Sequence, residues 1–546
     1  MTVLWQPAEE TIEQAQLTQF ARQVIRKRRL DINSYPEFYR WSVEEPEAFW
    51  SDLWDFAGVV ASRKGSTVLL DGDKMPGARW FPEARLNFSE NLMRRGDRGD
   101  AFVFWDESGL RRRLSYADLY SEVSRAAQAL AALGLRAGDR VAAFMPNIPE
   151  AGMLALAALS QGIVWSSCSP DFGVEGVLDR FGQIEPKVLF CADGYRYNGE
   201  THDSLARVGR LVEGLPTLRK VVVVPHLDAR VDVSDVPKAV VLQEWLRRYT
   251  PGEIAFAQLP FDHPIYILFT SGTTGKPKCI VHGAGGSLLQ ALKMYKLHMD
   301  LRPGERFFYF CTLNWVVWNL LFSGLAAEAS VMLYDGSPFA KHGRILFDYA
   351  EKERITHFGT SAKFIDAIAK RGLRPRDTHD LAALRMILST GSPLAPESFD
   401  FVYRSIKQDL HLASISGGTD IISCFALGNP IGPVWRGELQ CRGLGMAVEV
   451  YDDDGRPVRG EKGELVCTAP FPSMPVGFWN DADGAKYRAA YFERYANVWW
   501  HGDYVELTDH DGLIIYGRSD AVLNPGGVRI GTAEIYRQVE RLDEVV

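Results

Sequence analysis

Short apolar runs recur along the middle of the chain, and their spacing constrains the fold more than any other feature. Each run is four to six residues long, which suits a buried strand, and helical segments lie between most of the runs. The runs are Val141–Phe144, Lys187–Cys191, Val221–Val224, Ile265–Thr270, Val331–Tyr334 and Met386–Ser389. Strands that alternate with helices are typical of α/β proteins with largely parallel sheets. We therefore predict an α/β fold.

A capping pattern and an apolar stripe predict the helix that begins this region. Ser115 is followed three residues later by Asp118, a spacing at which the two side chains can close the first helical turn. Apolar residues then recur at four-three spacing, on one face of a helix. They are Leu119, Val123, Ala126, Leu130 and Leu133. Gly134 is of the residue type that commonly ends a helix.

The chain is too long for one compact core, since it has 546 residues. Residues 1–113 are predicted to form an N-terminal extension that wraps a core. Residues 114–434 are predicted to form two doubly wound α/β subdomains. After them, glycines and short strand-like segments predict a smaller β-rich subdomain at 435–519. Two of those segments are Glu464–Thr468 and Leu513–Tyr516.

Charge, cysteine usage and the apolar windows exclude several classes of protein. A net charge of -8 and a pI near 5.9 argue against nucleic acid as the main partner. The seven cysteines form no C-x-x-C pair, which favours reduced, buried thiols and a cytoplasmic location. The N-terminus does not resemble a signal peptide. The apolar windows 151–165 and 316–334 contain glycines and polar residues, which predicts buried helices rather than membrane insertion.

The most informative segment is Ile265–Lys278, where an apolar strand runs into a loop of hydroxyls, glycines and two lysines. Glycines let backbone N–H groups approach an anion, hydroxyls donate further hydrogen bonds, and lysines supply charge to phosphate oxygens. A Walker loop is excluded because only two residues separate Gly272 from Gly275, and Lys276 is followed by Pro277. A short Gly/Ser motif is usually an ordinary surface loop. The motif at Thr270–Lys278 is less easily explained in this way because it has nine residues and follows a strand.

The segment Thr270–Lys278 closely resembles the phosphate loop of the adenylate-forming superfamily, which includes acyl-CoA synthetases, luciferases and adenylation domains. The resemblance implies that the loop holds the β- and γ-phosphates of ATP while a carboxylate attacks the α-phosphorus. The residues that it assigns to this task are Thr270, Ser271, Gly272, Thr273, Thr274, Gly275, Lys276 and Lys278.

Two further segments resemble motifs that follow the phosphate loop in this superfamily. Gly391-Ser392-Pro393 resembles a turn that contacts adenine. Gly418-Thr419-Asp420 occupies the place of a Thr-Glu motif, whose threonine contacts the α-phosphate and whose acid helps to bind Mg²⁺. Asp420 is one methylene shorter than glutamate, although aspartate is also a competent oxygen ligand.

The remaining motifs imply ribose contacts and a hinge. Trp500–Asp503 resembles a motif whose acid, here Asp503, accepts hydrogen bonds from both ribose hydroxyls. By the same resemblance Arg518 contacts ribose, Asp520 is the hinge and Arg529 reaches the α-phosphate. The large domain would then be 1–519, with the hinge and the start of a truncated C-terminal domain at 520–546. Family members continue for about a hundred residues, one small domain, beyond this point. We therefore expect that most of the C-terminal α+β domain and its catalytic lysine are absent, and that a chain ending at Val546 binds ATP but adenylates slowly.

Three segments, Leu388–Leu394, Ser416–Ile421 and Phe471–Pro475, resemble acetoacetyl-CoA synthetases more than any other subgroup. Trp80–Asn91 looks like the N-terminal segment of acetyl- and acetoacetyl-CoA synthetases. Gly417 falls where acetyl-CoA synthetases place a tryptophan that closes the acyl pocket. Without that indole we expect room for a longer acyl group. Asn314, Trp315 and Val316 are expected to form the other wall of the pocket, and the polar Asn314 or Asn319 is expected to face a ketone of the acyl group.

The expected activity is therefore ligation of acetoacetate to coenzyme A with ATP and Mg²⁺, and the partners are these small molecules. Arg196 matches a position that meets the nucleotide of coenzyme A in acetyl-specific relatives. Two alternatives stay open. One is a synthetase for another short acid, such as propionate or butyrate. The other is a non-catalytic nucleotide-binding homologue.

Overall fold

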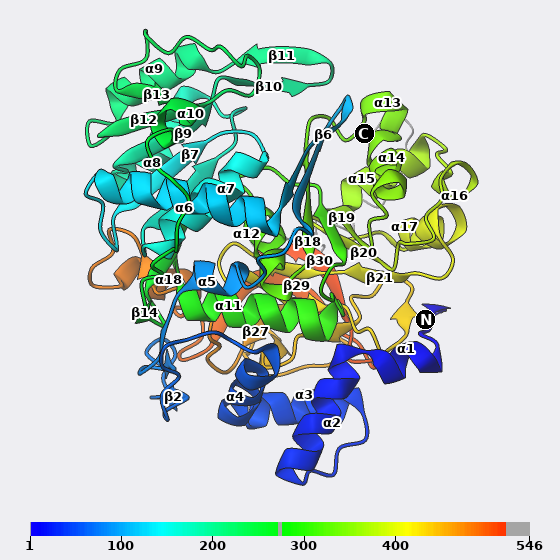
Figure 1. The fold of residues 1–546 in the computed structure, drawn as a ribbon. Coiled ribbons are helices and arrows are strands. Elements are labelled where there is room, and N and C mark those ends of the chain that lie inside the picture. Colours follow the sequence, from blue (N-terminus) through cyan, green and yellow to red (C-terminus); the bar gives the residue numbers. More distant parts are fainter. Residues whose placement is uncertain (1, 271–275, 520–546) are drawn as a thin grey trace.

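The fold is α/β, with two large sheets that face each other across a shared core and a smaller antiparallel sheet beside them (Figure 1). The computed structural model describes residues 2–270 and 276–519. Each of the six apolar runs forms a strand in one of the two large sheets, so the predicted α/β class is confirmed.

The first large sheet has eight strands in the order β13-β12-β9-β7-β8-β15-β16-β28. The strands from β13 to β15 run parallel, and β16 and β28 are antiparallel to their neighbours. Their bounds are β7 Arg140–Phe144, β8 Val164–Cys168, β9 Val188–Ala192, β12 Lys220–Val224, β13 Ala239–Val241, β15 Pro264–Thr270, β16 Lys278–Gly283 and β28 Gly477–Phe478.

The second large sheet has seven strands in the order β21-β20-β19-β17-β18-β5-β6, and all but the edge strand β6 run parallel. The strands are β5 Asp100–Asp106, β6 Gly109–Ser115, β17 Arg306–Tyr309, β18 Ser330–Asp335, β19 His357–Ser361, β20 Met386–Thr390 and β21 His411–Ser414. Strand β5 is an inner strand although it lies within the residues assigned to the extension. The division of the chain at residues 113, 434 and 519 stays a prediction.

The predicted β-rich region contains a four-stranded antiparallel sheet in the order β26-β27-β29-β30. Its strands are β26 Val448–Tyr451, β27 Lys462–Cys467, β29 Trp499–Leu507 and β30 Leu513–Arg518. A three-stranded sheet connects it to the second large sheet through β22 Ser416–Gly418, β23 Ser423–Leu427 and β25 Cys441–Arg442. Short pairs complete the strands: β1 Val3–Trp5 with β24 Val434–Trp435, β2 Leu69–Leu70 with β3 Arg79–Trp80, β4 Arg85–Leu86 with β14 Leu259–Pro260, and β10 Gly194–Tyr197 with β11 Glu200–Asp203.

Alternating strand residues bury both faces of the large sheets. Val221 and Val223 pack in the outer cluster with helices α8 (Val174–Ile184) and α9 (Leu205–Gly214), whereas Val222 and Val224 belong to the central core. That core also includes residues from the second sheet and from α7 (Pro149–Ser160), which is buried at every position except Glu150. Helices α14 (Ile345–Lys352), α15 (Ala362–Lys370) and α17 (Pro396–Phe401) cover the other face of the second sheet. This two-sided burial explains why the strands are continuous apolar runs.

The helices have the following bounds, and short π- and 3-10 segments extend three of them. The list is α1 Glu9–Gln14, α2 Gln16–Arg28, α3 Tyr35–Glu44, α4 Pro46–Ala57, α5 Phe88–Leu92, α6 Tyr116–Ala132, α7 Pro149–Ser160, α8 Val174–Ile184, α9 Leu205–Gly214, α10 Leu242–Leu246, α11 Ala284–Lys293, η1 Met294–His298, α12 Val316–Ser323, η2 Gly324–Ala327, α13 Ala340–Gly343, α14 Ile345–Lys352, α15 Ala362–Lys370, α16 Pro375–Thr378, α17 Pro396–Phe401, η3 Val402–Ile406 and α18 Ala485–Tyr491. The predicted cap of α6 is confirmed, because the Ser115 side chain accepts a hydrogen bond from the Asp118 N–H.

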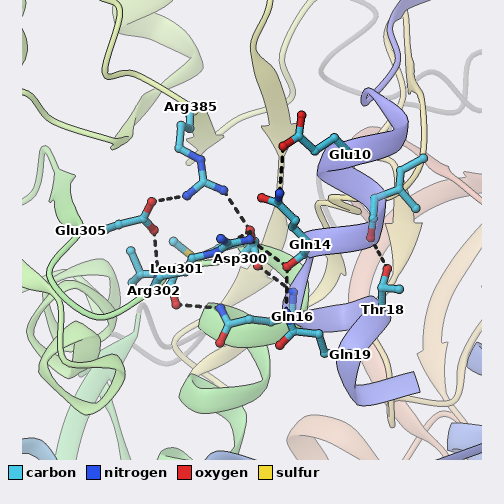
Figure 2. Close-up of polar contacts among 12 residues, drawn as sticks. Glu10, Gln14, Gln16, Thr18, Gln19, Asp300, Leu301, Arg302, Glu305 and Arg385 are labelled. Atoms are coloured by element: carbon cyan, nitrogen blue, oxygen red, sulfur yellow. Dashed lines mark hydrogen bonds and ion pairs between the residues drawn. The ribbon is translucent and has the colours of Figure 1, made fainter. Parts of the chain in front are cut away.

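Asp300 fastens the N-terminal helices to the second large sheet (Figure 2). Its Oδ1 accepts a hydrogen bond of 2.8 Å from the backbone N–H of Gln16, the first residue of α2. Its Oδ2 lies 2.8 Å from Arg302 and 2.9 Å from Arg385. The buried carboxylate therefore satisfies an orphan helix N–H while two guanidinium groups neutralise its charge.

The thiols and the apolar windows agree with the expectations from composition. All seven cysteines are buried and free. The windows at 151–165 and 316–334 contribute the short helices α7 and α12 and parts of strands. Within the described ranges, no helix combines the length and apolarity needed to cross a membrane.

Candidate functional site

A cavity of about 540 Å³ lies where the second large sheet, the end of β15 and the small sheet meet. Strands β20 and β21 are parallel neighbours, so the segments that follow them leave the same edge of the sheet. These segments contribute Thr390–Pro393 and Ser414–Asp420 to the lining. Open α/β sheets commonly bind ligands outside the carboxyl ends of their strands.

The cavity brings together most of the predicted site residues that the structure describes. They are Asn314, Trp315, Val316, Gly391, Ser392, Pro393, Gly417, Gly418, Thr419, Asp420, Asp503 and Arg518. The cavity lining does not include Thr270, Lys276 and Lys278, which belong to the predicted phosphate loop, or Arg196. Ser271, Gly272, Thr273, Thr274, Gly275, Asp520 and Arg529 lie outside the described residues.

The predicted phosphate loop lies in sequence between two antiparallel strands. Thr270 ends β15, and Lys278 begins β16 as its register partner. The sequence predicted the first strand but not the second. Lys278 is partly buried and its ammonium lies 5.7 Å from the centre of the Tyr491 ring, whereas Lys276 is exposed. The structure therefore places Lys278 beside the cavity wall that contains Asp420.

Three side chains from separate elements hold the turn that carries Asp420. The Nε2 of His282, on β16, lies 2.8 Å from the Thr419 carbonyl oxygen. Because a carbonyl only accepts, Nε2 must carry the proton, and burial lowers the His282 pKa to about 4. The Ser473 hydroxyl donates to the Ile421 carbonyl at 2.6 Å. The Tyr491 hydroxyl donates to Oδ1 of Asp420.

The geometry at Gly417 corrects the reason given for an open pocket. Gly417 lines the cavity, but a Cβ built on it would lie 2.0 Å from the Ser423 carbonyl oxygen and 2.5 Å from the Cys424 Cα. A side chain here would collide with strand β23 instead of filling the cavity. The glycine is therefore required for close pairing of β22 with β23. The sequence shows that an indole is missing but not which way its Cβ would point.

The wall predicted at residues 314–316 is only partly apolar. Trp315 is 47% exposed and lines the cavity beside Asn314, whose Oδ1 accepts a 2.6 Å hydrogen bond from Thr312. Trp318 instead belongs to the core, where it stacks on Phe322 at 5.2 Å. Asn319 is buried and is not part of the lining, so of the two asparagines considered for a ketone only Asn314 faces the cavity region.

Asp503 and Arg518 are opposed across the β29–β30 pair. The Arg518 Nη1 donates to Oδ1 of Asp503 at 3.0 Å and to the His501 carbonyl at 3.0 Å. Asp503 is 8% exposed, whereas the Arg518 side chain is 55% exposed. Burial lowers the pKa of His501, which packs edge-on against Phe425. The pair thus offers a buried carboxylate beside a partly exposed guanidinium at the cavity wall.

Arg196 is not gathered into the cavity. It lies on the β10–β11 hairpin, where its Nη1 is 3.9 Å from Oδ2 of Asp106. The same hairpin is held at its tip by Glu107, which accepts hydrogen bonds from the N–H groups of Asn198 and Gly199 at 2.6 and 2.7 Å.

The side chains at the cavity that could bind a metal suit a magnesium ion that is also bound by phosphate oxygens. Within residues 2–270 and 276–519, no group of three or more His, Cys, Asp or Glu side chains could hold a metal alone. Mg²⁺ prefers one or two carboxylates together with water and substrate phosphates. Asp420 supplies such a carboxylate, and one of its oxygens accepts a hydrogen bond from Tyr491. Asp420 therefore fits Mg²⁺ as one ligand among several, the others coming from a bound nucleotide and water.

Sequence reasoning missed several residues that build the site. The cavity is also lined by four apolar residues, Phe269, Ile415, Leu439 and Ile515. Their side chains carry no polar group that would mark them in the sequence as site residues. His282 and Tyr491 contact the Thr419–Asp420 turn from 137 and 71 residues away. Buried histidines and tyrosines more often fill cores, so nothing local in the sequence distinguishes these two.

Comparisons with known proteins agree with the motifs. Residues 88–475 match the family described as AMP-binding enzyme, and residues 35–92 match the acetyl-coenzyme A synthetase N-terminus. The chain is 56% identical to an acetoacetyl-coenzyme A synthetase of Rhizobium meliloti over 99% of this chain and 83% of that protein. It is 43% identical to the mouse acetoacetyl-CoA synthetase over 100% of this chain and 82% of that one.

A solved structure is similar throughout. The acetoacetyl-CoA synthetase from Streptomyces lividans superposes with a TM-score of 0.94 and 42% identity, covering 99% of this chain and 84% of that chain. The fold is therefore shared along nearly the whole of this chain.

Proposed function

The chain belongs to the AMP-binding enzyme family, and from this we propose that it joins acetoacetate to coenzyme A with ATP, giving acetoacetyl-CoA, AMP and pyrophosphate through an acyl-adenylate. One observation carries the proposal. A single cavity gathers the expected adenine turn, the Thr419–Asp420 turn and the Asp503–Arg518 pair, with Trp315 on its wall. These are the parts that would hold a nucleotide and an acid side by side.

The chain's residues act by positioning and electrostatics. Gly391, Ser392 and Pro393 would contact adenine, and the Asp503 carboxylate would accept hydrogen bonds from the ribose hydroxyls with Arg518 beside it. Phosphate charge would be offset by Lys276 and Lys278, which follow Ser271–Gly275 in the predicted phosphate loop. The acid's carboxylate could then attack the α-phosphorus and pyrophosphate would leave, so that no covalent enzyme intermediate is needed.

Asp420 is the proposed protein ligand of Mg²⁺, which when bound would neutralise phosphate charge. Arg529 at the α-phosphate, Asp520 as the hinge and Arg196 toward coenzyme A stay predictions by resemblance. We place the acyl group beside Asn314, Trp315 and Val316, near the Gly417 backbone. A cytoplasmic location is also part of the proposal, supported by seven free cysteines.

A panel of acids tests the substrate. Pyrophosphate release would be measured with ATP, Mg²⁺ and coenzyme A on acetoacetate, butyrate, propionate and acetate, and each thioester identified by mass. We expect kcat/KM for acetoacetate to exceed that for butyrate by about tenfold, since a site that hydrogen-bonds a ketone loses that partner with butyrate. Faster turnover of butyrate than of acetoacetate would contradict acetoacetate as the preferred substrate. The proposed adenylation chemistry would still stand.

A second assay addresses the non-catalytic alternative. Acid-dependent exchange of labelled pyrophosphate into ATP reports adenylation without coenzyme A. We expect exchange that is lost in Lys278→Ala and Asp420→Ala. If the full-length protein binds ATP but shows no exchange with any acid of the panel, a nucleotide-binding homologue becomes the better description.

A further inference from the structure

Tyr491 is the last residue of α18 and reaches the site from outside the motifs. It is 4% exposed, and its hydroxyl donates to Oδ1 of Asp420. A carboxylate can only accept, which fixes the direction of this hydrogen bond. Burial, and then the charge of Asp420, raise the Tyr491 pKa well above its ordinary value, so the proton is present throughout the neutral range.

The Tyr491 ring is held on several sides. It stacks on Trp499 with ring centres 3.9 Å apart and planes 13° from parallel. Phe478 and Tyr487 meet it edge-on at 5.8 and 5.5 Å. Such packing fixes the side-chain rotamer, so the hydroxyl is aimed at Asp420 before any ligand arrives.

The same ring contacts the base of the phosphate loop. The Lys278 ammonium lies 5.7 Å from the ring centre, within the range of a cation–π interaction. Tyr491 therefore meets two of the charged groups that the proposed function assigns to ATP and Mg²⁺. Its hydroxyl meets Asp420, and its ring face meets Lys278. Trp499, on which it stacks, begins the strand that carries Asp503.

We propose that Tyr491 is a positioning residue for Mg·ATP, orienting the Asp420 carboxylate toward the metal and holding the Lys278 ammonium beside the phosphates. This deepens the proposed function and rests on it. The hydrogen bond from the hydroxyl to Oδ1 fixes the orientation of the Asp420 carboxylate, and both carboxylate oxygens keep lone pairs for a cation. A freely rotating aspartate, one methylene shorter than glutamate, would lose more entropy on binding a metal than one already held.

The test is the pair Tyr491→Phe and Tyr487→Phe. Both tyrosines lie on α18 and are buried, but the Tyr487 hydroxyl has no hydrogen-bond partner in the described structure. Free Mn²⁺ would be titrated by electron paramagnetic resonance in the presence of ATP, with no acid or coenzyme A. ATP affinity would be measured separately in EDTA by calorimetry.

We expect Tyr491→Phe to weaken ATP-dependent Mn²⁺ binding about tenfold, as for a lost hydrogen bond to a charged group. Metal-free ATP affinity should change less than threefold, and Tyr487→Phe should match the wild type. In an Asp420→Asn background Tyr491→Phe should have little further effect, because the hydroxyl acts through that carboxylate.

Two outcomes overturn the inference in different ways. If the wild-type chain binds Mn²⁺ with ATP and Tyr491→Phe binds it equally well, or if the two variants lose affinity alike, Tyr491 is only a core residue and the proposed function stands. If the wild-type chain shows no ATP-dependent Mn²⁺ binding, the assignment of Asp420 fails and the role of Tyr491 fails with it.

Discussion

Arg518 lies directly across the β29–β30 pair from Asp503, and its Nη1 is 3.0 Å from Oδ1 of that carboxylate. The register of two antiparallel strands thus fixes a charge pair at the edge of the cavity. A carboxylate held in this way is suited to accept hydrogen bonds from two neighbouring hydroxyls.

Replacing Asp503 by asparagine should weaken ATP binding about tenfold, because the charge-assisted hydrogen bonds to ribose are lost. Calorimetry with ATP and with 2′,3′-dideoxy-ATP separates this effect from general damage. The wild type should prefer ATP, and Asp503→Asn should not. The control is Asp509→Asn, an equal loss of charge at an exposed position of the connecting turn. An undiminished preference for ATP in Asp503→Asn would remove Asp503 from the ribose site.

Gly417 and Gly418 should respond very differently to alanine. A Cβ at 417 meets backbone atoms of β23 at 2.0 and 2.5 Å, whereas at 418 the nearest atom is Oδ2 of Asp420 at 3.4 Å. We expect Gly417→Ala to lower the free energy of unfolding by about 1–3 kcal/mol through forced backbone movement, and Gly418→Ala by clearly less. Guanidinium unfolding measures both. Equal stability of the two variants would contradict the close β22–β23 pairing.

The contrast between Gly417 and Gly418 shows which features can be predicted from the sequence and which cannot. The strands were predictable because apolar runs express a local requirement of burial. The glycine-rich segment Thr270–Lys278 likewise predicts an anion-binding loop from its own residues, and that role stays a prediction. The direction of the Cβ at Gly417 depends on the register of β22 with β23, which no local pattern encodes.

The same limit applies to groups that act at a distance. Asp420 was found because it sits in an ordered motif. His282 and Tyr491, which hold its turn, come from a strand and a helix far along the chain. Their residue types are common in cores, so only the folded arrangement distinguishes them. Most of the site's polar groups could thus be predicted, whereas their supports could not.

Substitution of Trp315 should weaken ligand binding, whereas substitution of Trp318 should lower the stability of the fold. Trp315 is 47% exposed at the cavity, and Trp318 is 1% exposed between Trp165 and Phe322. We expect Trp318→Ala to cost about 3–5 kcal/mol of unfolding free energy, and Trp315→Ala less than about 1 kcal/mol. With acetoacetate, Trp315→Ala should raise KM several-fold while the protein stays folded. An unchanged KM for acetoacetate in Trp315→Ala would move the acyl group away from this wall.

His298 should make the fold less stable in mild acid. It is fully buried; its Nδ1 lies 2.8 Å from the Gly428 carbonyl oxygen, and its Nε2 accepts a hydrogen bond from the Leu444 N–H at 3.3 Å. Only the neutral Nδ1–H tautomer satisfies both partners. Burial first, and then the charge of Lys293, lower the His298 pKa to about 3.

Between pH 6.5 and about 3 the unfolded chain binds a proton at this histidine that the folded chain does not, so stability falls as the pH falls. The contribution is about 1.4 kcal/mol for each pH unit, or roughly 2 kcal/mol between pH 6.5 and 5. His298→Asn should be less stable than the wild type at pH 7, but its unfolding free energy should decline less steeply toward pH 5. Guanidinium titrations at pH 7, 6 and 5 give the two slopes, and exposed His342→Asn controls for loss of a surface imidazole. Parallel slopes for His298→Asn and the wild type would show that His298 takes up its proton in the folded state as readily as in the unfolded one.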